Sequence, residues 1–446
     1  MIWLLSMFQR FGRKDDRHLR EIASGSFLAL IARVLGGLSA YAFALLISRA
    51  YGAAGLGLYS LSVTLLTILV TLGGLGLGAS AVRMVPQYAA ANNLAAIRHL
   101  YGLMVKLVLP IAVAIAALLY VFASFVAESV FHNPSLAPAF RIVSMVLPLL
   151  AIVRVNIEMV RGFKNIGFSE YLRSLHVPFL GAIILVLMLW IGSDAYAAVT
   201  SYSLGVIAAF LLSAPYMVLK LRGFPVRKDK ALQSRELLGV SMPMLSGEIM
   251  SLSVGRVDML MIGLLASTTA VGLYDIPFRL AAGVGLILAS INMISAPKFS
   301  ELFWSNDMEG LRRVVRMTSR VLFWSAAPIL IALLVAPTFW LGLFGEEFRG
   351  SYLVLILLAI GQFVNAASGS VGCFLNMTGN HKVLGRITVA AILLNIVLNA
   401  LLIPPFGIIG AAFATMTTLI LWNLTGVVFV WMKFRIKTFY VPFVAS

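Results

Sequence analysis

Long apolar segments recur along the whole chain, and they constrain its fold more than any other feature. Each is roughly 20 residues or longer, which is enough for a helix to cross a hydrocarbon core ~30 Å thick. Apolar residues occupy 61% of the 446 positions and charged residues only 11%, whereas about one-quarter of a soluble domain is charged. No water-soluble fold of this length has enough interior to bury that much hydrocarbon. The sequence therefore predicts an all-α integral membrane protein.

Twelve apolar segments can be delimited between charged or turn-rich breaks, six in each half of the chain. They span 24–50, 55–80, 100–126, 135–163, 168–192, 195–219, 236–265, 270–298, 313–342, 351–377, 383–404 and 407–432. The resulting division is an N-terminal tail over 1–23, a six-helix lobe over 24–220, a basic linker over 221–235, a second six-helix lobe over 236–432 and a C-terminal tail over 433–446.

The positions of the basic residues orient these segments. An even number of spans places both termini on one side of the membrane. If that side is the cytoplasm, only Arg49, Arg141 and Arg349 of the 34 Lys and Arg residues fall in outer turns, and four more lie within helices. All the others then lie on the cytoplasmic side, as the positive-inside rule requires. The linker and both tails are therefore predicted to be cytoplasmic.

The remaining composition excludes several classes of function. The net charge of +17 would suggest a nucleic-acid partner in a soluble protein, but here the positions of the basic residues along the chain matter more than their sum. Cys373 is the single cysteine, which excludes an intrachain disulfide and argues against a Cys-based metal site. The longest connection outside the membrane is 221–235, which leaves no room for a soluble catalytic domain. We therefore expect a protein that is not an enzyme and has no resident metal or cofactor.

The two halves of the chain carry an internal repeat. Residues 57–59, Gly-Leu-Tyr, open the second segment, and the same tripeptide at 272–274 opens the eighth. After each of those segments an Asn, Asn92 or Asn306, precedes a basic amphipathic stretch. Because both copies occupy even-numbered segments, they share one topology and are related by an axis along the membrane normal. The repeat predicts two parallel six-helix lobes around a central cavity.

Two motifs and the twelve-helix layout resemble a known superfamily. Residues 33–36, Arg-Val-Leu-Gly, lie in the first segment, and residues 51–59, Tyr-Gly-Ala-Ala-Gly-Leu-Gly-Leu-Tyr, span the first outer turn. The chain resembles the multidrug/oligosaccharidyl-lipid/polysaccharide (MOP) flippase superfamily over nearly its whole length, and within it the polysaccharide transporters that include Wzx-type O-antigen flippases. Residues 33–36 are also similar to the first helix of the lipid II flippase, a sister branch, but this chain has no helix pair beyond twelve.

This resemblance implies a V-shaped pair of lobes and a flippase of the bacterial inner membrane. Such a protein moves undecaprenyl-diphosphate-linked oligosaccharide from the inner to the outer leaflet by alternating access, for cell-surface polysaccharide biosynthesis. The expected partners are the polyprenyl-diphosphate-linked glycan, membrane lipids and glycan polymerase machinery. We expect the monomer to be the functional form.

Four arginines within the segments are candidates for binding the substrate diphosphate. Charge at membrane depth is costly, so each such residue is a functional hypothesis. Arg33 and Arg154 lie about 14 Å from the cytoplasmic ends of their helices, and Arg256 and Arg279 about 14 Å from the outer ends of theirs. Guanidinium is permanently charged and suited to bidentate phosphate contacts. The inner pair would hold the diphosphate in the inward-open state and the outer pair in the outward-open state.

A structural alternative applies to the same arginines. Arg154 is four residues before Glu158, and Asp275 is four before Arg279, so each pair can form an ion pair on one helix face. Arg33 and Arg256 have no such partner in the sequence, which favours a role in substrate binding.

Polar residues at matched depth suggest a candidate coupling-ion site. Glu248 in the seventh segment and Asn395 in the eleventh each lie about 18 Å from the cytoplasmic end, and Asn399 shares a helix face with Asn395. A carboxylate and amide oxygens could hold Na⁺, or the carboxylate could take up H⁺. Hydrogen bonding between helices is the simpler interpretation of such residues. The glycine run over 73–78 similarly favours close helix packing over a bend.

Two other functions compete with the flippase. A cation-coupled multidrug antiporter of the same superfamily would need acids at mid-depth to bind cations, and the first six segments have none there. A membrane-embedded glycan polymerase or ligase would need catalytic groups on a substantial outer loop, and the outer turns are short.

Overall fold

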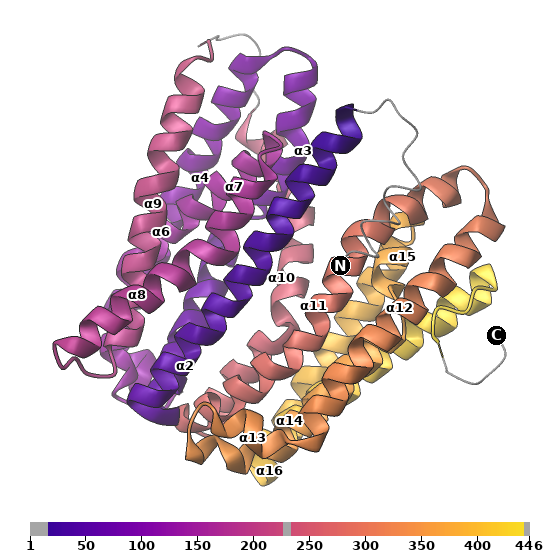
Figure 1. Cartoon of the computed structure of the whole chain (residues 1–446). Coiled ribbons are helices and arrows are strands. Elements are labelled where there is room, and N and C mark those ends of the chain that lie inside the picture. The colour runs from indigo at the N-terminus through magenta and orange to yellow at the C-terminus, as the bar shows by residue number, and fades with distance from the viewer. Residues whose placement is uncertain (1–16, 226–232, 441–446) are drawn as a thin grey trace.

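The structure is a computed structural model that describes residues 17–225 and 233–440. Within these ranges the regular elements are all helical, and they form two lobes that meet at one end and diverge toward the other (Figure 1). This arrangement confirms the predicted all-α fold of two helical lobes. The ends of both predicted tails and residues 226–232 of the predicted linker lie outside the described residues.

The N-terminal lobe begins earlier than expected, because its first helix starts at Arg17 and not at residue 24. The helix therefore extends into the predicted tail over 1–23, and its first apolar span is counted from Ile31. The helices of this lobe are α2 Arg17–Gly73, α3 Leu77–Ala90, α4 Leu94–Val121, α5 Ala123–Phe125, η1 Val126–Val130, α6 Leu136–Gly162, α7 Ile166–Glu170, η2 Tyr171–His176, α8 Val177–Trp190 and α9 Ala197–Arg222. Gly52, with φ of 66°, breaks α2 into two membrane spans.

The C-terminal lobe follows the same plan. Its helices are α10 Ser234–Leu265, α11 Thr268–Trp304, α12 Met308–Val335, α13 Pro337–Gly342, η3 Glu346–Ser351, α14 Tyr352–Ala367, α15 Val371–Met377 and α16 His381–Phe434. Gly407 divides α16 into two spans. After α16 the chain turns back, and Ile436 and Thr438 are buried against the lobe.

The described residues account for the twelve predicted spans. Nine continuous helical stretches have the length and apolar composition to cross a membrane. Two of them, α2 and α16, each contain two spans separated by a non-helical glycine. The helix α10, with 32 residues, supplies the twelfth.

The internal repeat extends to helix boundaries and caps. The helices α4 and α12 are each 28 residues long. A residue with positive φ, Asn92 or Asn306, stands two positions before each of them. The next residue then caps the helix, because the side chain of Asn93 accepts from Ala96 N and that of Asp307 accepts from Gly310 N. Matching caps at matching positions support a duplicated six-helix unit.

The glycine run corrects one expectation. The predicted helix over 55–80 is interrupted between Gly73 and Leu77, and Gly76 takes a left-handed conformation. A Cβ at Gly76 would clash with the backbone of α10 at Ser241 and Leu245. The run therefore makes a bend as well as a close helix contact, although packing alone was favoured from the sequence.

The lobes contact each other at the end that contains the break in α2 at Gly52 together with α13 and η3 (Figure 1). We call this the closed end. The Arg49 Nε donates to Leu343 O at 2.7 Å, and Ala53 N donates to Glu347 Oε1 at 2.6 Å. Nearby, a Cβ on Gly57 of α2 would clash with Thr268 O of α11. Under the predicted topology this closed end faces the outside, so the lobes diverge toward the cytoplasm.

Candidate functional site

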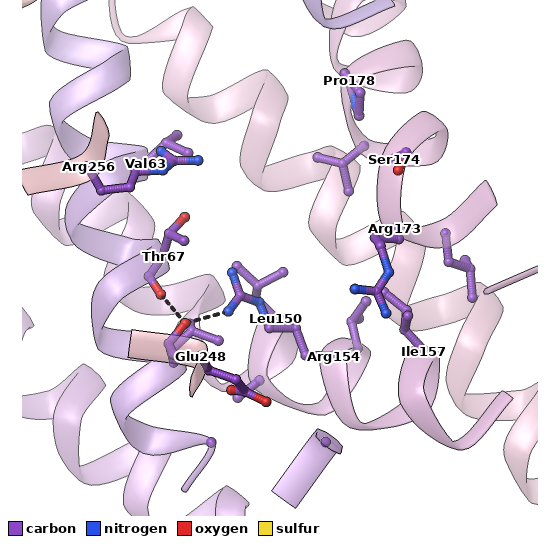
Figure 2. A pocket seen from close by; sticks show the side chains of 18 of the residues that line it. Val63, Thr67, Leu150, Arg154, Ile157, Arg173, Ser174, Pro178, Glu248 and Arg256 are labelled. Carbon is purple, nitrogen blue, oxygen red and sulfur yellow. Dashed lines mark hydrogen bonds between the residues drawn. The ribbon is translucent and has the colours of Figure 1, made fainter. Parts of the chain in front are cut away.

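A cavity of about 760 Å³ lies between the two lobes and is lined by residues of both (Figure 2). The charged residues in its lining are Arg154, Glu158, Arg161, Arg173, Glu248, Arg256, Asp275 and Arg279. Five arginines against three carboxylates give the described lining a net formal charge of +2. The cavity is therefore cationic although the surrounding helices are apolar.

Arg154 of α6 lies within this cavity, as predicted. Its Nη1 donates to Thr71 Oγ1 of α2 at 2.6 Å. The alternative that it pairs with Glu158 on its own helix is wrong, because Glu158 binds Arg161 and Arg173. Among the described residues, Arg154 forms no ion pair with a carboxylate. Its charge therefore remains available to an anion in the cavity.

Arg256 of α10 contributes a second guanidinium from the opposite lobe. Its Nη1 donates to Thr64 Oγ1 at 3.2 Å, and the described residues give it no carboxylate partner either. Thr64 and Thr71 lie two turns apart on α2, or roughly 10 Å along its axis. One helix face therefore holds an arginine from each lobe at two depths. The sequence could not reveal this, because the threonines are ordinary residues of an apolar helix.

Arg279 also lines the cavity, but it has a carboxylate partner. Its Nε is 2.6 Å from Asp275 Oδ2, which confirms the structural alternative for this pair. The same Asp275 oxygen accepts from Ser60 Oγ of the other lobe at 3.0 Å. The Tyr41 hydroxyl donates to Arg279 O. Arg279 is thus part of a contact between the lobes.

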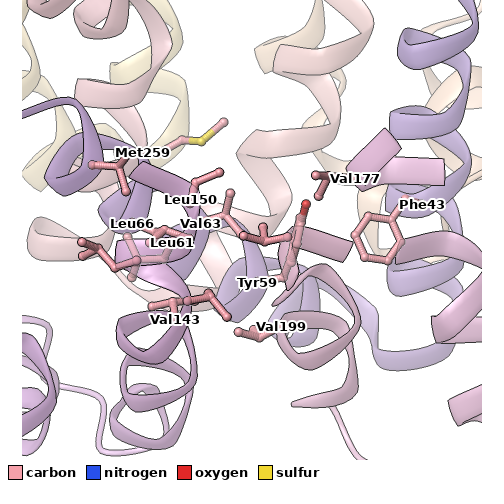
Figure 3. Close-up of a cluster of buried hydrophobic side chains, with 14 of the residues drawn as sticks. Phe43, Tyr59, Leu61, Val63, Leu66, Val143, Leu150, Val177, Val199 and Met259 are labelled. Atoms are coloured by element: carbon pink, nitrogen blue, oxygen red, sulfur yellow. The ribbon is translucent and has the colours of Figure 1, made fainter. Parts of the chain in front are cut away.

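Figure 3 shows a cluster of buried aromatic and aliphatic side chains, and several of its members also line the cavity. Tyr59 is packed edge-on between Phe43 and Tyr202, at ring-centroid distances of 5.3 and 5.9 Å. Both tyrosines line the cavity. Their rings place apolar surface beside the arginines, and a less polar surrounding strengthens the attraction between an arginine and an anion.

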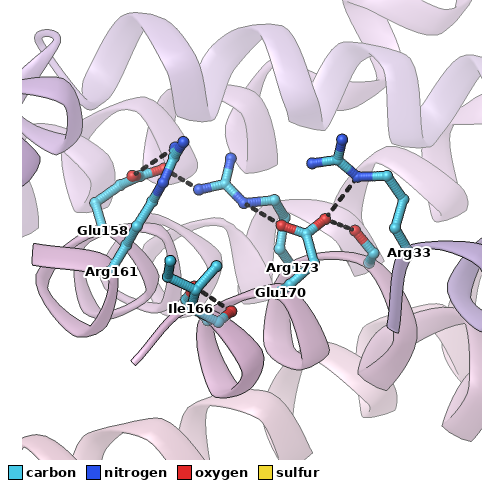
Figure 4. Close-up of polar contacts among 8 residues, drawn as sticks. Arg33, Glu158, Arg161, Ile166, Glu170 and Arg173 are labelled. Carbon is cyan, nitrogen blue, oxygen red and sulfur yellow. Dashed lines mark hydrogen bonds and ion pairs between the residues drawn. The ribbon is translucent and has the colours of Figure 1, made fainter. Parts of the chain in front are cut away.

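Arg33 is not among the residues that line the cavity. Its Nε is 3.1 Å from Glu170 Oε1, so the expectation that it lacks an acidic partner is wrong. Glu170 belongs to a chain of ion pairs that alternates three arginines with two glutamates (Figure 4). We call these residues the charge row. Its members are Arg33, Glu158, Arg161, Glu170 and Arg173.

The predicted coupling-ion residues lie at two places. Glu248 lines the cavity. Asn395 and Asn399 instead form a buried group with Asp258 of α10. Asn399 Nδ2 donates to Asp258 Oδ1 at 2.7 Å and to Asn395 Oδ1 at 3.1 Å. The carboxylate associated with the two asparagines is therefore Asp258. The predicted grouping of these asparagines with Glu248 is wrong.

Two hydroxyl groups complete this buried group. Thr415 Oγ1 of α16 donates to Asp258 Oδ2 at 2.5 Å, and the Tyr274 hydroxyl donates to the same oxygen at 3.0 Å. Asp258 is 1% exposed, and Asn399 Oδ1 is buried without a hydrogen-bond partner. Carboxylate, amide and hydroxyl oxygens are the ligands that hard cations such as Na⁺ prefer. The described residues contain no cluster of three or more His, Cys, Asp or Glu that would suit a transition metal.

Family models match both lobes of the chain. A model described as polysaccharide biosynthesis protein matches residues 22–303, and the MatE model matches residues 243–401. The first of these covers more than half of the chain.

A curated relative is similar in sequence to about half of this chain. The chain is 26% identical over 225 residues to the probable low-salt glycan biosynthesis flippase Agl15 of Haloferax volcanii, which covers 50% of this chain and 47% of that protein. The chain thus matches about half the length of this curated relative.

Solved structures share the fold over almost the whole chain. The lipid II flippase MurJ in an inward closed conformation has a TM-score of 0.72 at 16% identity and covers 92% of this chain and 87% of that one. An inward-facing multidrug resistance MATE family transporter of the MOP superfamily has a TM-score of 0.69 at 13% identity and covers 92% and 98%. The described chain therefore has the MOP transporter fold.

Proposed function

The chain belongs to the polysaccharide biosynthesis protein family of the MOP superfamily, and on that premise we propose that it is a lipid-linked oligosaccharide flippase. Its substrate would be a glycan joined through a diphosphate to a polyprenyl carrier. Transport would run from the cytoplasmic to the outer leaflet of the bacterial inner membrane, with both termini in the cytoplasm. The name of the relative Agl15, a probable glycan biosynthesis flippase, supports this substrate class.

The observation that carries the proposal is the pair Arg154 and Arg256 in one cavity between the lobes. A diphosphate with a substituent on each phosphate carries two negative charges, which match the net charge of +2 in the described lining. Each guanidinium is oriented by a threonine hydroxyl and forms no ion pair with an acid among the described residues, so phosphate oxygens can take the remaining N–H groups. Because the arginines come from opposite lobes, an anion between them would respond to lobe movement.

The charge of the cavity argues against the drug antiporter, and the short connections argue against the glycan polymerase or ligase. A drug antiporter binds cationic compounds, and a cationic lining would repel them. A glycan polymerase or ligase would need reactive groups on the outer side, where the described connections are short helices that hold the lobes together. The flippase is therefore the function that the geometry favours.

We further propose that Asp258 and its neighbours Asn395, Asn399 and Thr415 couple transport to Na⁺ or H⁺. An ionised carboxylate buried in a membrane protein is costly unless a cation or a proton neutralises it. Its present partners all donate hydrogen bonds, and none carries a positive charge. Glu248 in the cavity is the other carboxylate that could take up a proton.

Loss of the gene tests the direction of transport. Cells that lack the protein should accumulate the lipid-linked glycan on the cytoplasmic leaflet, as measured by its accessibility to a membrane-impermeant glycan-modifying reagent. Arg154→Gln and Arg256→Gln should each restore less than about one-tenth of normal export at normal protein level, because each removes charge-assisted phosphate contacts. Accumulation of unpolymerised units on the outer leaflet would instead support a polymerase.

Ion dependence tests the coupling residues. In proteoliposomes, Asp258→Asn should abolish the response of transport to an imposed Na⁺ or H⁺ gradient. The same variant should still bind the substrate, because Asp258 is not among the residues that line the cavity. Transport that is indifferent to both gradients in the unmodified protein would refute the coupling.

A further inference from the structure

The charge row lies at the end of the cavity where the lobes diverge. Arg161 is in the last turn of α6, and Glu170 and Arg173 follow the short turn after it. Arg173 pairs with Glu158 through Nη2 and lies 3.9 Å from Glu170 through Nε. Figure 4 shows Arg173 in the middle of the row, between the two glutamates. Under the predicted topology, a substrate from the cytoplasm meets this row before it reaches Arg154.

Arg173 is one of three members of the row that line the cavity, with Glu158 and Arg161. It belongs to η2, a π-helical stretch, and π-helical turns occur often at functional sites. Arg173 and its neighbour Ser174 both line the cavity. Figure 2 shows the Arg173 guanidinium directed into the pocket on the same side as Arg154. Its side chain is 37% exposed, so it is accessible to a ligand.

The two glutamates have different environments. Glu170 is almost fully buried and accepts hydrogen bonds from Ser174 at 2.7 Å and from Arg33 at 3.1 Å, so its position is fixed. Glu158 lines the cavity and is shared between Arg173 and Arg161, the latter at 3.8 Å. An anion that takes Arg173 would leave Glu158 with Arg161, and no acid would be left unpaired. The row also has one more arginine than it has glutamates.

We propose that Arg173 is an entry site for a phosphate of the substrate, and that Glu158 occupies it when no substrate is bound. This inference rests on the proposed function. The incoming diphosphate displaces the Glu158 carboxylate from Arg173, and Glu158 then pairs with Arg161. Arg154 lies two turns deeper than Arg161 on α6, or roughly 10 Å, so the diphosphate next moves from Arg173 to Arg154. The ligand class is a prenyl diphosphate ester.

Binding of farnesyl diphosphate to the purified full chain in detergent tests this site. Arg173→Gln should weaken binding roughly tenfold, the loss of one charge-assisted hydrogen bond. The affinity of Arg173→Lys should lie between that of Arg173→Gln and that of the unmodified protein, because the charge remains and the bidentate geometry is lost. Glu158→Gln should bind at least about twofold tighter, because it removes the competing anion.

The opposite signs separate a binding role from a structural one. Both Arg173→Gln and Glu158→Gln break the same ion pair, so a purely structural pair would make both variants weaken binding alike. Lys298→Gln breaks an exposed ion pair outside the cavity and is the control. Inorganic pyrophosphate should show the same dependence on Arg173 at lower affinity, and farnesol should show none. Equal affinity of Arg173→Gln and the unmodified chain would overturn the proposal, as would weaker binding by Glu158→Gln.

The proposed function and the entry site can fail separately. If the unmodified chain binds no prenyl diphosphate, or if Arg154→Gln binds it normally, the flippase proposal itself fails. If Arg154→Gln loses binding and Arg173→Gln does not, only the entry site fails. Thermal unfolding of each variant checks that it is folded.

Discussion

Four charged residues in the described membrane region each have a particular partner that offsets part of the cost of burial. Arg154 and Arg256 are oriented by threonine hydroxyls, Arg279 is neutralised by Asp275, and Asp258 is surrounded by hydrogen-bond donors. These environments separate arginines that look equivalent in sequence. Two of them remain available to an anion, and the third holds the lobes together.

The Asp275–Arg279 pair makes a prediction about stability. Asp275 is 1% exposed, so Asp275→Asn leaves the Arg279 charge without its buried partner. Removal of one member of a buried pair costs about 3 kcal/mol. We expect a clearly lower midpoint of thermal unfolding in detergent. Glu346→Gln breaks the exposed pair with Arg349 and is the control, because an exposed pair contributes at most about 1 kcal/mol. Equal midpoints for the two variants would contradict this account of Asp275.

Whole helices also depart from regularity where they adjoin the cavity. The chain breaks between α2 and α3, and the π-helical stretch η2 interrupts the fifth span between α7 and α8. At the closed end, regular helices come unusually close instead. Gly57 of α2 faces Thr268 O, and Gly272 of α11 faces Ala53 O, so the repeated Gly-Leu-Tyr motif forms a symmetric backbone contact. The motif that revealed the duplication is therefore also where its two copies meet.

Substitution of these glycines should open the closed end. Gly57→Ala and Gly272→Ala each place a methyl group against a carbonyl oxygen of the opposite helix. We expect longer distances between spin labels on the two lobes at that end, measured by electron paramagnetic resonance. Gly102→Ala is the matched control, because Gly102 lies in α4 and an added Cβ there meets nothing within 4 Å. Unchanged distances in both interface variants would show that the contact does not hold the lobes.

The described part of the chain has one closed end and one end where the lobes diverge, and under the proposed function this is one half of an alternating-access cycle. The closed end is held by the glycine contact and by the polar contacts of Arg49 and Glu347 across the lobes. All of these must break before the cavity can face the opposite side. The proposed transport therefore requires separation of α2 from the α13–η3 region and from the start of α11.

A cross-link at the closed end should stop transport. Ala53→Cys and Thr268→Cys place thiols on the two helices that meet there, in a Cys373→Ala background that removes the single native cysteine. A short bifunctional thiol reagent should trap the lobes and abolish glycan export in vesicles, whereas either single-cysteine variant should keep its export after treatment. Continued export by the cross-linked protein would exclude movement at this end.

Much of the fold could be predicted from the sequence, because the hydrophobic effect and charge placement act on local segments. Apolar length predicted the number of spans, and the spacing of the Gly-Leu-Tyr motif predicted two equivalent lobes. The orientation derived from the distribution of Lys and Arg stays a prediction. Three of the four candidate arginines do line the central cavity. Each of these signals lies within one segment or in a repeat along the chain.

The partners of those charges could be decided only by the tertiary structure. Arg33 binds Glu170, Arg154 binds Thr71 and not Glu158, and Asn399 binds Asp258. Each contact joins helices far apart in the sequence, and its energy depends on whether two faces meet at the same depth. Helical spacing predicts same-helix neighbours such as Asp275 and Arg279. It carries no information about which side chain of another helix comes within hydrogen-bonding distance.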